Sequence, residues 1–141
     1  MTFDGRCGAE IEKRINSAWS AFFGMKHLLL CDSASIVARL KVMDRVVPNT
    51  LLWCAGTWCP TQNDLKKIWS AQLAMVKKIV RVRRRLGEEL ELFMPRANRL
   101  CSSFLHIAAS ERWDRRVHVC VARFAGHVAR IHVYDPERLT V

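Results

Sequence analysis

The residues that could bind a metal ion are concentrated near the C-terminal end of this sequence. Histidine and cysteine are the usual zinc ligands, and four of them lie close together in the sequence: His118, Cys120, His127 and His132. On one helix these side chains would point in different directions, whereas zinc sites usually take ligands from two segments. We therefore expect no metal site, with Cys120 in the core and the histidines at the surface or in helix packing.

Carboxylates are the other groups whose spacing could indicate catalysis. Nucleotide transfer by a two-metal mechanism needs paired carboxylates held close together. No two aspartates are adjacent in this sequence, and most of them fall on predicted helix faces or caps. The Walker-type phosphate loop, the G-x-S-x-G motif and the H-E-x-x-H motif are also absent from the sequence. We expect neither a catalytic residue nor a cofactor in this chain.

Cations are the most informative chemical feature. The sequence has 23 Lys and Arg against 13 Asp and Glu, a formal net charge of +10, which favours polyanionic partners such as nucleic acid. A solvated basic surface, or cations that complement a helix dipole, would explain part of this excess. Dipole complementation needs only one or two cations, so we predict phosphate contacts from a larger group: Lys77, Lys78, Arg81, Arg84 and Arg85.

Aromatic and thiol side chains have simpler interpretations. Trp53, Trp58 and Trp69 could stack on nucleic-acid bases, but their helical spacing favours the core. The six cysteines include no C-x-x-C pair, which argues against both a zinc ribbon and a compact disulfide framework. We expect reduced, mostly buried thiols at these positions: Cys7, Cys31, Cys54, Cys59, Cys101 and Cys120.

The elements that must position these residues are all predicted to be helices. Apolar residues recur three and four apart over 9–30, which predicts a first helix. Asp32 or Ser33 could cap a second helix whose apolar face stays in phase from position 36 to position 58. Because Pro48 interrupts that face without changing its phase, we expect a kinked helix or two abutting helices there.

The third helix is predicted to carry the main group of cations. Thr61 and Asp64 resemble a capping box, so this helix begins near Gln62, and Gly87 ends the run. Its apolar stripe lies opposite the cations and comprises Leu65, Ile68, Trp69, Gln72, Met75, Val76 and Ile79. Further helices are predicted over 88–109, with Pro95 near the start, and over 113–131. No segment alternates convincingly as a strand, and the uncharged run 46–63 is too polar to span a bilayer.

Four segments resemble the region after the catalytic palm in reverse transcriptases of LINE-type, non-LTR retrotransposons. The opening "DGRCGAEIEKRINSAWSAF" is similar to the family's D-G-x-x-x-x-E-I-x-x-R-I pattern. "ARLKVMDRVVPNTLLWCAGTW" resembles the stretch that runs through a proline into L-L-Y-G-x-E-x-W, with Trp53, Cys54 and Gly56 as departures. "LKKIWSAQLAMVKKIVRVRRR" resembles the following basic helix. "ARFAGHVARI" resembles R-W-x-G-H-V-x-R-M, with Phe124 and Ile131 as departures.

The resemblance implies a thumb-like helical bundle of three main helices over residues 1–86, the second kinked at a proline, and a C-terminal helical extension over 87–141. The thumb of such a polymerase binds the backbone of the primer and template duplex. The apolar, uncharged segment 53–58 would anchor the helix pair of the thumb. The palm, with its Asp-Asp pair and magnesium, would lie upstream of Met1, so this chain is not expected to polymerise alone. Arg123, His127 and Arg130 form a weaker second candidate patch for phosphate.

The partners implied are an RNA/DNA hybrid or duplex backbone and the missing fingers and palm, in the nucleus or cytoplasm and not in a membrane. A different class of function stays open: a free-standing helical module whose apolar stripes bind a partner protein. A third possibility is an inert transposon relic, which would be poorly packed and prone to aggregation.

Overall fold

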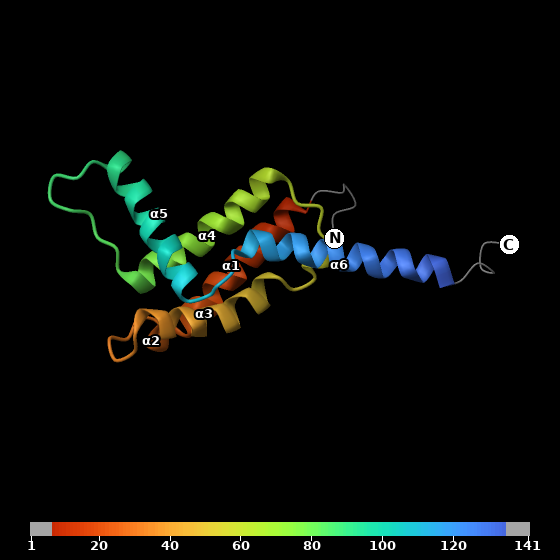
Figure 1. The fold of residues 1–141 in the computed structure, drawn as a ribbon, viewed down its shortest axis with the longest axis horizontal. Coiled ribbons are helices and arrows are strands. Elements are labelled where there is room, and N and C mark those ends of the chain that lie inside the picture. The colour runs from red at the N-terminus through yellow and green to blue at the C-terminus, as the bar shows by residue number, and fades with distance from the viewer. Residues whose placement is uncertain (1–6, 135–141) are drawn as a thin grey trace.

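Helices are the only regular secondary structure in the described part of the chain. A computed structural model describes the backbone of residues 7–134 and the side chains as far as residue 131. Within that range there is no strand, and the predicted all-α class is confirmed (Figure 1). The elements are α1 (Gly8–Gly24), α2 (Lys26–Leu29), α3 (Ile36–Leu51), the 3-10 helix η1 (Ala55–Thr57), α4 (Gln62–Val80), α5 (Leu90–Ile107) and α6 (Trp113–Tyr134).

The first predicted helix is divided in two. Met25 leaves the helical conformation at φ −105° and ψ 16°, directly after Gly24, and its N–H donates to the Phe22 carbonyl at 3.2 Å. Glycine is a poor helix former, so a helix is easily ended beside it. The expectation of one continuous helix over 9–30 was therefore wrong, and the four-residue helix α2 follows in place of its last turns.

The second predicted helix is shorter than expected. Its N-cap is Ser35, whose Oγ accepts from the Ala38 N–H at 3.2 Å, and neither of the two earlier polar residues caps it. Helix α3 continues through Pro48, so the proline does not divide it, but it ends at Leu51. Cys54 then adopts the left-handed conformation at φ 60°, which breaks the helical path. The in-phase face over 36–58 is therefore α-helical only as far as Leu51, and the 3-10 helix η1 follows.

Helix α4 is central to the packing and begins as predicted. Thr61 Oγ1 accepts from the Asp64 N–H at 3.2 Å, and Asp64 Oδ2 accepts from the Thr61 N–H at 3.0 Å, which confirms the capping box. Its buried residues include nearly all of the predicted stripe. α1, α3, α5 and α6 all pack against α4.

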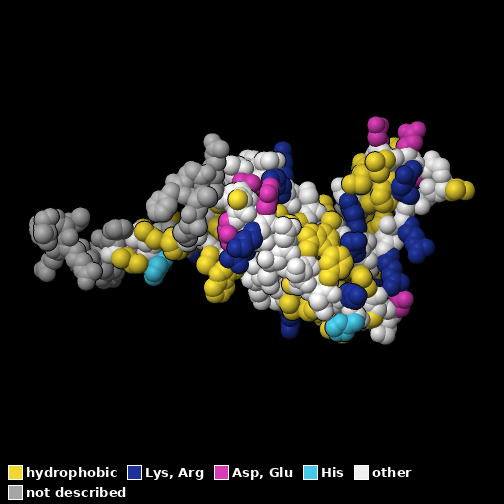
Figure 2. Space-filling view, turned by 180° about the vertical axis from the view of Figure 1, so that it is seen from behind, with side chains coloured by type: hydrophobic (Ala, Val, Ile, Leu, Met, Phe, Trp, Pro, Cys, Tyr) yellow, Lys and Arg dark blue, Asp and Glu magenta, His cyan; other side chains and the backbone are white. Residues whose placement is uncertain are grey.

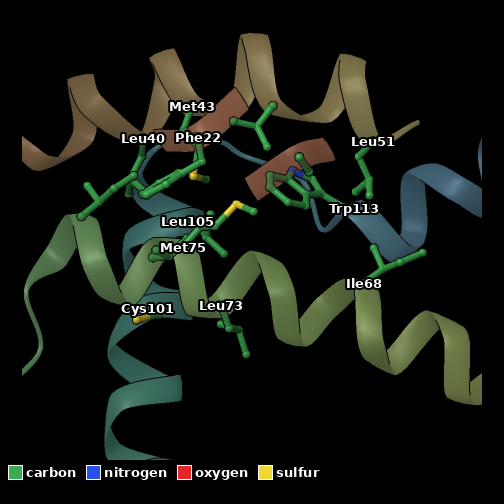
Figure 3. Close-up of a cluster of buried hydrophobic side chains, with 14 of the residues drawn as sticks. Phe22, Leu40, Met43, Leu51, Ile68, Leu73, Met75, Cys101, Leu105 and Trp113 are labelled. Atoms are coloured by element: carbon green, nitrogen blue, oxygen red, sulfur yellow. The ribbon is translucent and has the colours of Figure 1, made fainter. Parts of the chain in front are cut away.

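One hydrophobic core joins residues from both sides of position 87. Figure 3 shows Phe22, Leu40, Met43 and Met75 close to side chains that α5 and α6 contribute to the same cluster: Cys101, Leu105 and Trp113. The C-terminal extension therefore packs on the first four helices over its described part. Two segments project from this body: the connector 81–89 with the start of α5, and, at the other end, the C-terminal half of α6 (Figure 1).

The segment 53–58 has a different role from the one expected of it. Trp58 and Ala55 are buried, Trp53 is 63% exposed, and η1 forms an extensive contact with α6. A Cβ added to Gly56 would lie 2.9 Å from Phe124 Cβ and 3.2 Å from the Cys120 carbonyl oxygen. Helix α6 therefore packs on the segment 53–58, and Gly56 permits the close approach of α6 to η1.

Replacing Gly56 with alanine is expected to destabilise the fold by about 1–3 kcal/mol, because the added methyl overpacks a tight contact. Chemical denaturation followed by circular dichroism would measure this loss. Gly24→Ala is the matched control, since a Cβ at Gly24 meets no atom within 4 Å. Equal stabilities for the two variants would contradict the close packing of α6 on η1.

Candidate nucleic-acid interface

The cations of the third predicted helix do not form a single helical face. Helix α4 ends at Val80, and Arg81 adopts the left-handed conformation at φ 57°. Arg84 and Arg85 therefore lie in the connector to α5, and the expectation that they share a helix face with Arg81 was wrong. The physical reason lies in tertiary contacts of Arg81: its guanidinium donates to the Leu30 carbonyl at 2.6 Å and pairs with Asp32 at 2.8 Å.

The two lysines at the end of α4 lie on different sides of the helix. Lys78 Nζ lies 5.9 Å from the centroid of the Phe23 ring of α1. Lys77 is half-buried toward α5, where it lies close enough to Cys101 to affect that thiol. Burial raises the pKa of the Cys101 thiol to about 11, and the positive charge of Lys77 offsets part of the rise. Both lysines belong to the last turn of α4, directly before the connector.

We call residues 81–99 the arm: the connector 81–89 and the first turns of α5. Four arginines of the arm are exposed and take part in none of the ion pairs found among residues 7–131: Arg83, Arg84, Arg85 and Arg99. Figure 2 shows Lys and Arg side chains around hydrophobic ones over this projecting end of the molecule, at the right of the view. The sequence prediction did not include Arg83, because it assumed a helix on which only Arg81, Arg84 and Arg85 share a face.

Glu88 holds the arm in shape. Its carboxylate accepts two hydrogen bonds from Arg96, at 2.6 and 2.7 Å, and one from the Arg85 backbone N–H at 2.9 Å. The Arg84 guanidinium donates to the Glu88 carbonyl at 2.6 and 3.1 Å, and Arg96 also donates to the Arg83 carbonyl at 3.0 Å. Arg84 and Arg96 therefore fold the connector, while the exposed side chain of Arg85 forms none of these hydrogen bonds.

Acidification is expected to loosen the arm before the core unfolds. The hydrogen bonds from Arg96, and then from the Arg85 N–H, lower the pKa of Glu88 from 4.5 to about 2. A depressed pKa means that Glu88 contributes stability above pH 4.5 and loses that contribution as the pH falls from 4.5 toward 2. Hydrogen exchange at the Arg85 amide, corrected for its intrinsic pH dependence, should lose protection over this range.

The variant Glu88→Gln is the control for this titration, because it removes the titrating carboxylate. The Arg85 amide of that variant should exchange faster at pH 6 and show no further loss of protection between pH 4.5 and 2. If the Arg85 amide of the wild type kept full protection down to pH 2, the Glu88 carboxylate would not be the group that holds the arm in shape.

The second candidate patch lies on the projecting half of α6. Arg123, His127 and Arg130 are all exposed, and their spacing of four and three residues places them on one side of the helix. Among the residues with described side chains, no group of three or more His, Cys, Asp or Glu could hold a metal ion. The side chain of His132, one of the zinc candidates, lies outside the described residues.

The tryptophans and cysteines only partly follow the sequence predictions. Trp58 is in the core, whereas Trp53 is exposed and the half-buried Trp69 is covered by Arg112, whose Cζ lies 4.2 Å from the ring centroid. All six cysteines are free thiols, but only Cys101 is buried, so the expectation of mostly buried thiols was wrong. Cys54, which the predicted helix face would have buried, is exposed because α3 ends at Leu51, and Cys59 is exposed as well.

Comparison with known proteins adds no relative to this description. No protein-family model, no curated protein and no solved structure matches the chain. In the part of the chain that the structure describes, none of the helices has the length and apolar character needed to cross a membrane.

Proposed function

We propose that this chain binds the sugar-phosphate backbone of an RNA/DNA hybrid or duplex without reading its sequence, as the thumb and C-terminal extension of a LINE-type reverse transcriptase would. It carries none of the catalytic carboxylates of such a polymerase and would not polymerise alone. The observation that carries the proposal is the group of exposed cations at one end of the molecule, on the arm and on the adjoining last turn of α4.

The type of side chain favours backbone contact over base recognition. Phosphate groups are bound by Lys and Arg wherever these can reach them, and such contacts carry no sequence information. Lys78, Arg83, Arg85 and Arg99 are exposed and have no carboxylate partner within the described range. Arg81 and Arg84 already bind backbone carbonyls, so we assign them to the shape of the interface.

The triple variant Lys77→Gln, Lys78→Gln and Arg85→Gln tests the assignment. It removes three candidate phosphate contacts and leaves the hydrogen bonds of Arg81, Arg84 and Arg96 in place. Each contact contributes about 0.9 to the slope of log affinity against log salt on duplex DNA, so the slope should become shallower by up to about 2.7. Fluorescence anisotropy with a labelled duplex and an RNA/DNA hybrid, at several salt concentrations, would measure it.

The matched control removes the same charge from other helices. Lys13, Lys26 and Lys41 are exposed on α1, α2 and α3 and form no ion pair with a described residue. Their triple replacement by glutamine should leave the salt slope close to that of the wild type. Equal losses in the two triple variants would show that diffuse net charge, and not the arm, binds nucleic acid.

One observation favours a second function, that of a protein-interaction module. The arm exposes large apolar side chains next to its cations, among them Leu86, Leu90, Leu92 and Met94. Exposed apolar groups gathered on one segment often mark a protein contact. Sedimentation of the purified chain distinguishes the two functions, because this module would be a compact monomer or dimer without affinity for polyanions.

A further inference from the structure

A pocket lies between α4, the end of α5, the connector that leads to α6 and the first turn of α6. Its volume is about 300 Å³. It is lined mainly by polar and aromatic side chains, with Leu105 at its base: Trp69, Ser102, His106, Ser110, Arg112 and Arg115. None of these residues belongs to the arm or to the patch on α6.

The wall of this pocket is held by buried hydrogen bonds. Gln72 of α4 is fully buried, and its Nε2 donates to the Glu111 carbonyl at 3.2 Å while its Oε1 accepts from the Trp113 N–H at 2.9 Å. Arg112 lies over the Trp69 ring and donates to both Asp114 carboxylate oxygens, at 3.0 and 2.7 Å. The connector is therefore fixed in place without a ligand.

Several donors in the pocket lack a partner within the described structure. Ser110 Oγ is buried and forms no hydrogen bond, although buried polar atoms in folded proteins nearly always have one. His106 and Arg115 are exposed, and their side chains form no hydrogen bond or ion pair among residues 7–131. Glu111 is the one acid in the lining, and its carboxylate already lies 3.9 Å from Arg116 Nε.

We propose that this pocket binds a phosphate monoester. Guanidinium, imidazole and hydroxyl groups that converge on one space are the donors that phosphate oxygens accept from, and arginine suits them best. The pocket is at the small end of the range for organic ligands, and the half-buried Trp69 supplies apolar surface for the group that carries the phosphate. A mononucleotide and the 5′-phosphorylated end of a strand share this chemistry.

NMR titration of the full chain tests the proposal, with AMP, adenosine and inorganic phosphate as probes and the Trp69 indole N–H as reporter. AMP should bind at least about tenfold more tightly than adenosine, because a hydrogen bond to a charged group is lost with the phosphate. Arg115→Gln and Ser110→Ala should each weaken AMP binding, the former by about tenfold or more. Arg45→Gln, an exposed arginine of α3 outside the pocket, should leave it unchanged.

Equal affinity for AMP and adenosine would overturn the proposal, as would unchanged AMP binding by Arg115→Gln. Thermal unfolding of that variant should match the wild type, since Arg115 is exposed. A 5′-phosphorylated oligonucleotide that shifts the Trp69 signal more strongly than its 5′-hydroxyl form would identify a strand end as the source. If only AMP shifts it, the source is a free mononucleotide, which also supports the proposal.

This inference does not depend on binding by the arm. The triple variant of Lys77, Lys78 and Arg85 shares no residue with the pocket, so its affinity for AMP should equal that of the wild type. Absence of nucleic-acid binding by the arm and absence of AMP binding in the pocket would therefore be separate results.

Discussion

Replacing Trp113 with alanine is expected to lower the free energy of unfolding by about 3–5 kcal/mol. Trp113 is fully buried and is among the largest side chains of the core, where it lies in one cluster with residues of α1, α3 and α4. Its indole Nε1 forms no hydrogen bond within the described structure, so the loss would come from packing. Urea denaturation followed by circular dichroism at 222 nm would measure it.

The control for this variant is the same substitution at Trp53, which is 63% exposed. Exposed positions away from special contacts usually change stability by less than about 0.5 kcal/mol, so Trp53→Ala should remain close to wild type. If Trp113→Ala were equally mild, α6 would not be part of the core, and the extension would fold apart from the first four helices.

Gln72→Leu is expected to lower the free energy of unfolding by about 2–4 kcal/mol, nearly as much as Trp113→Ala. The leucine would fit the apolar surroundings, but the Trp113 N–H and the Glu111 carbonyl would both lose their partner. Each buried polar group left unsatisfied costs about 1–3 kcal/mol. The same denaturation experiment measures the loss, and NMR should show the largest shifts at the connector 108–112.

Gln62→Leu places the same change on the exposed first turn of α4 and should have little effect. If Gln72→Leu raised the free energy of unfolding, the two hydrogen bonds of Gln72 would stabilise the fold less than the burial of an apolar leucine side chain does. The phosphate-monoester pocket would then also lose the residue that we hold responsible for its fixed wall.

Local signals in the sequence predicted the helices well, because they depend on short-range chemistry. The capping box at Thr61 and Asp64 sets the start of α4 through bonds between residues three apart. Periodic apolar residues predicted the α4 stripe and the existence of α5 and α6 in the same way. These features need no knowledge of the rest of the chain.

Helix ends were harder to predict where tertiary contacts decide them. Cys54 and Arg81 adopt left-handed conformations that non-glycine residues rarely take, and no glycine marks either position. Arg81 gains bonds to the α2–α3 turn, far away in sequence. Since these bonds decide where α4 ends, the sequence predicted the charge of the arm but not its shape.

Buried polar residues were missed for a similar reason. Gln72 counted as one member of an apolar stripe, and its partners lie 39 and 41 residues further along the chain. Arg39 is buried as well and donates to the carbonyls of Leu29 and Ile79, at the ends of α2 and α4. Nothing in the spacing of either residue indicates such partners, so only the folded chain reveals them.

The proposed binding of nucleic-acid backbone does not involve reading of its sequence. Its most direct test is the salt dependence of wild-type affinity for two RNA/DNA hybrids of unrelated sequence. We expect equal affinities for both hybrids and a slope of log affinity against log salt of about −2 or steeper, as three or more phosphate contacts would give. A slope near zero, or a strong preference for one hybrid, would contradict it.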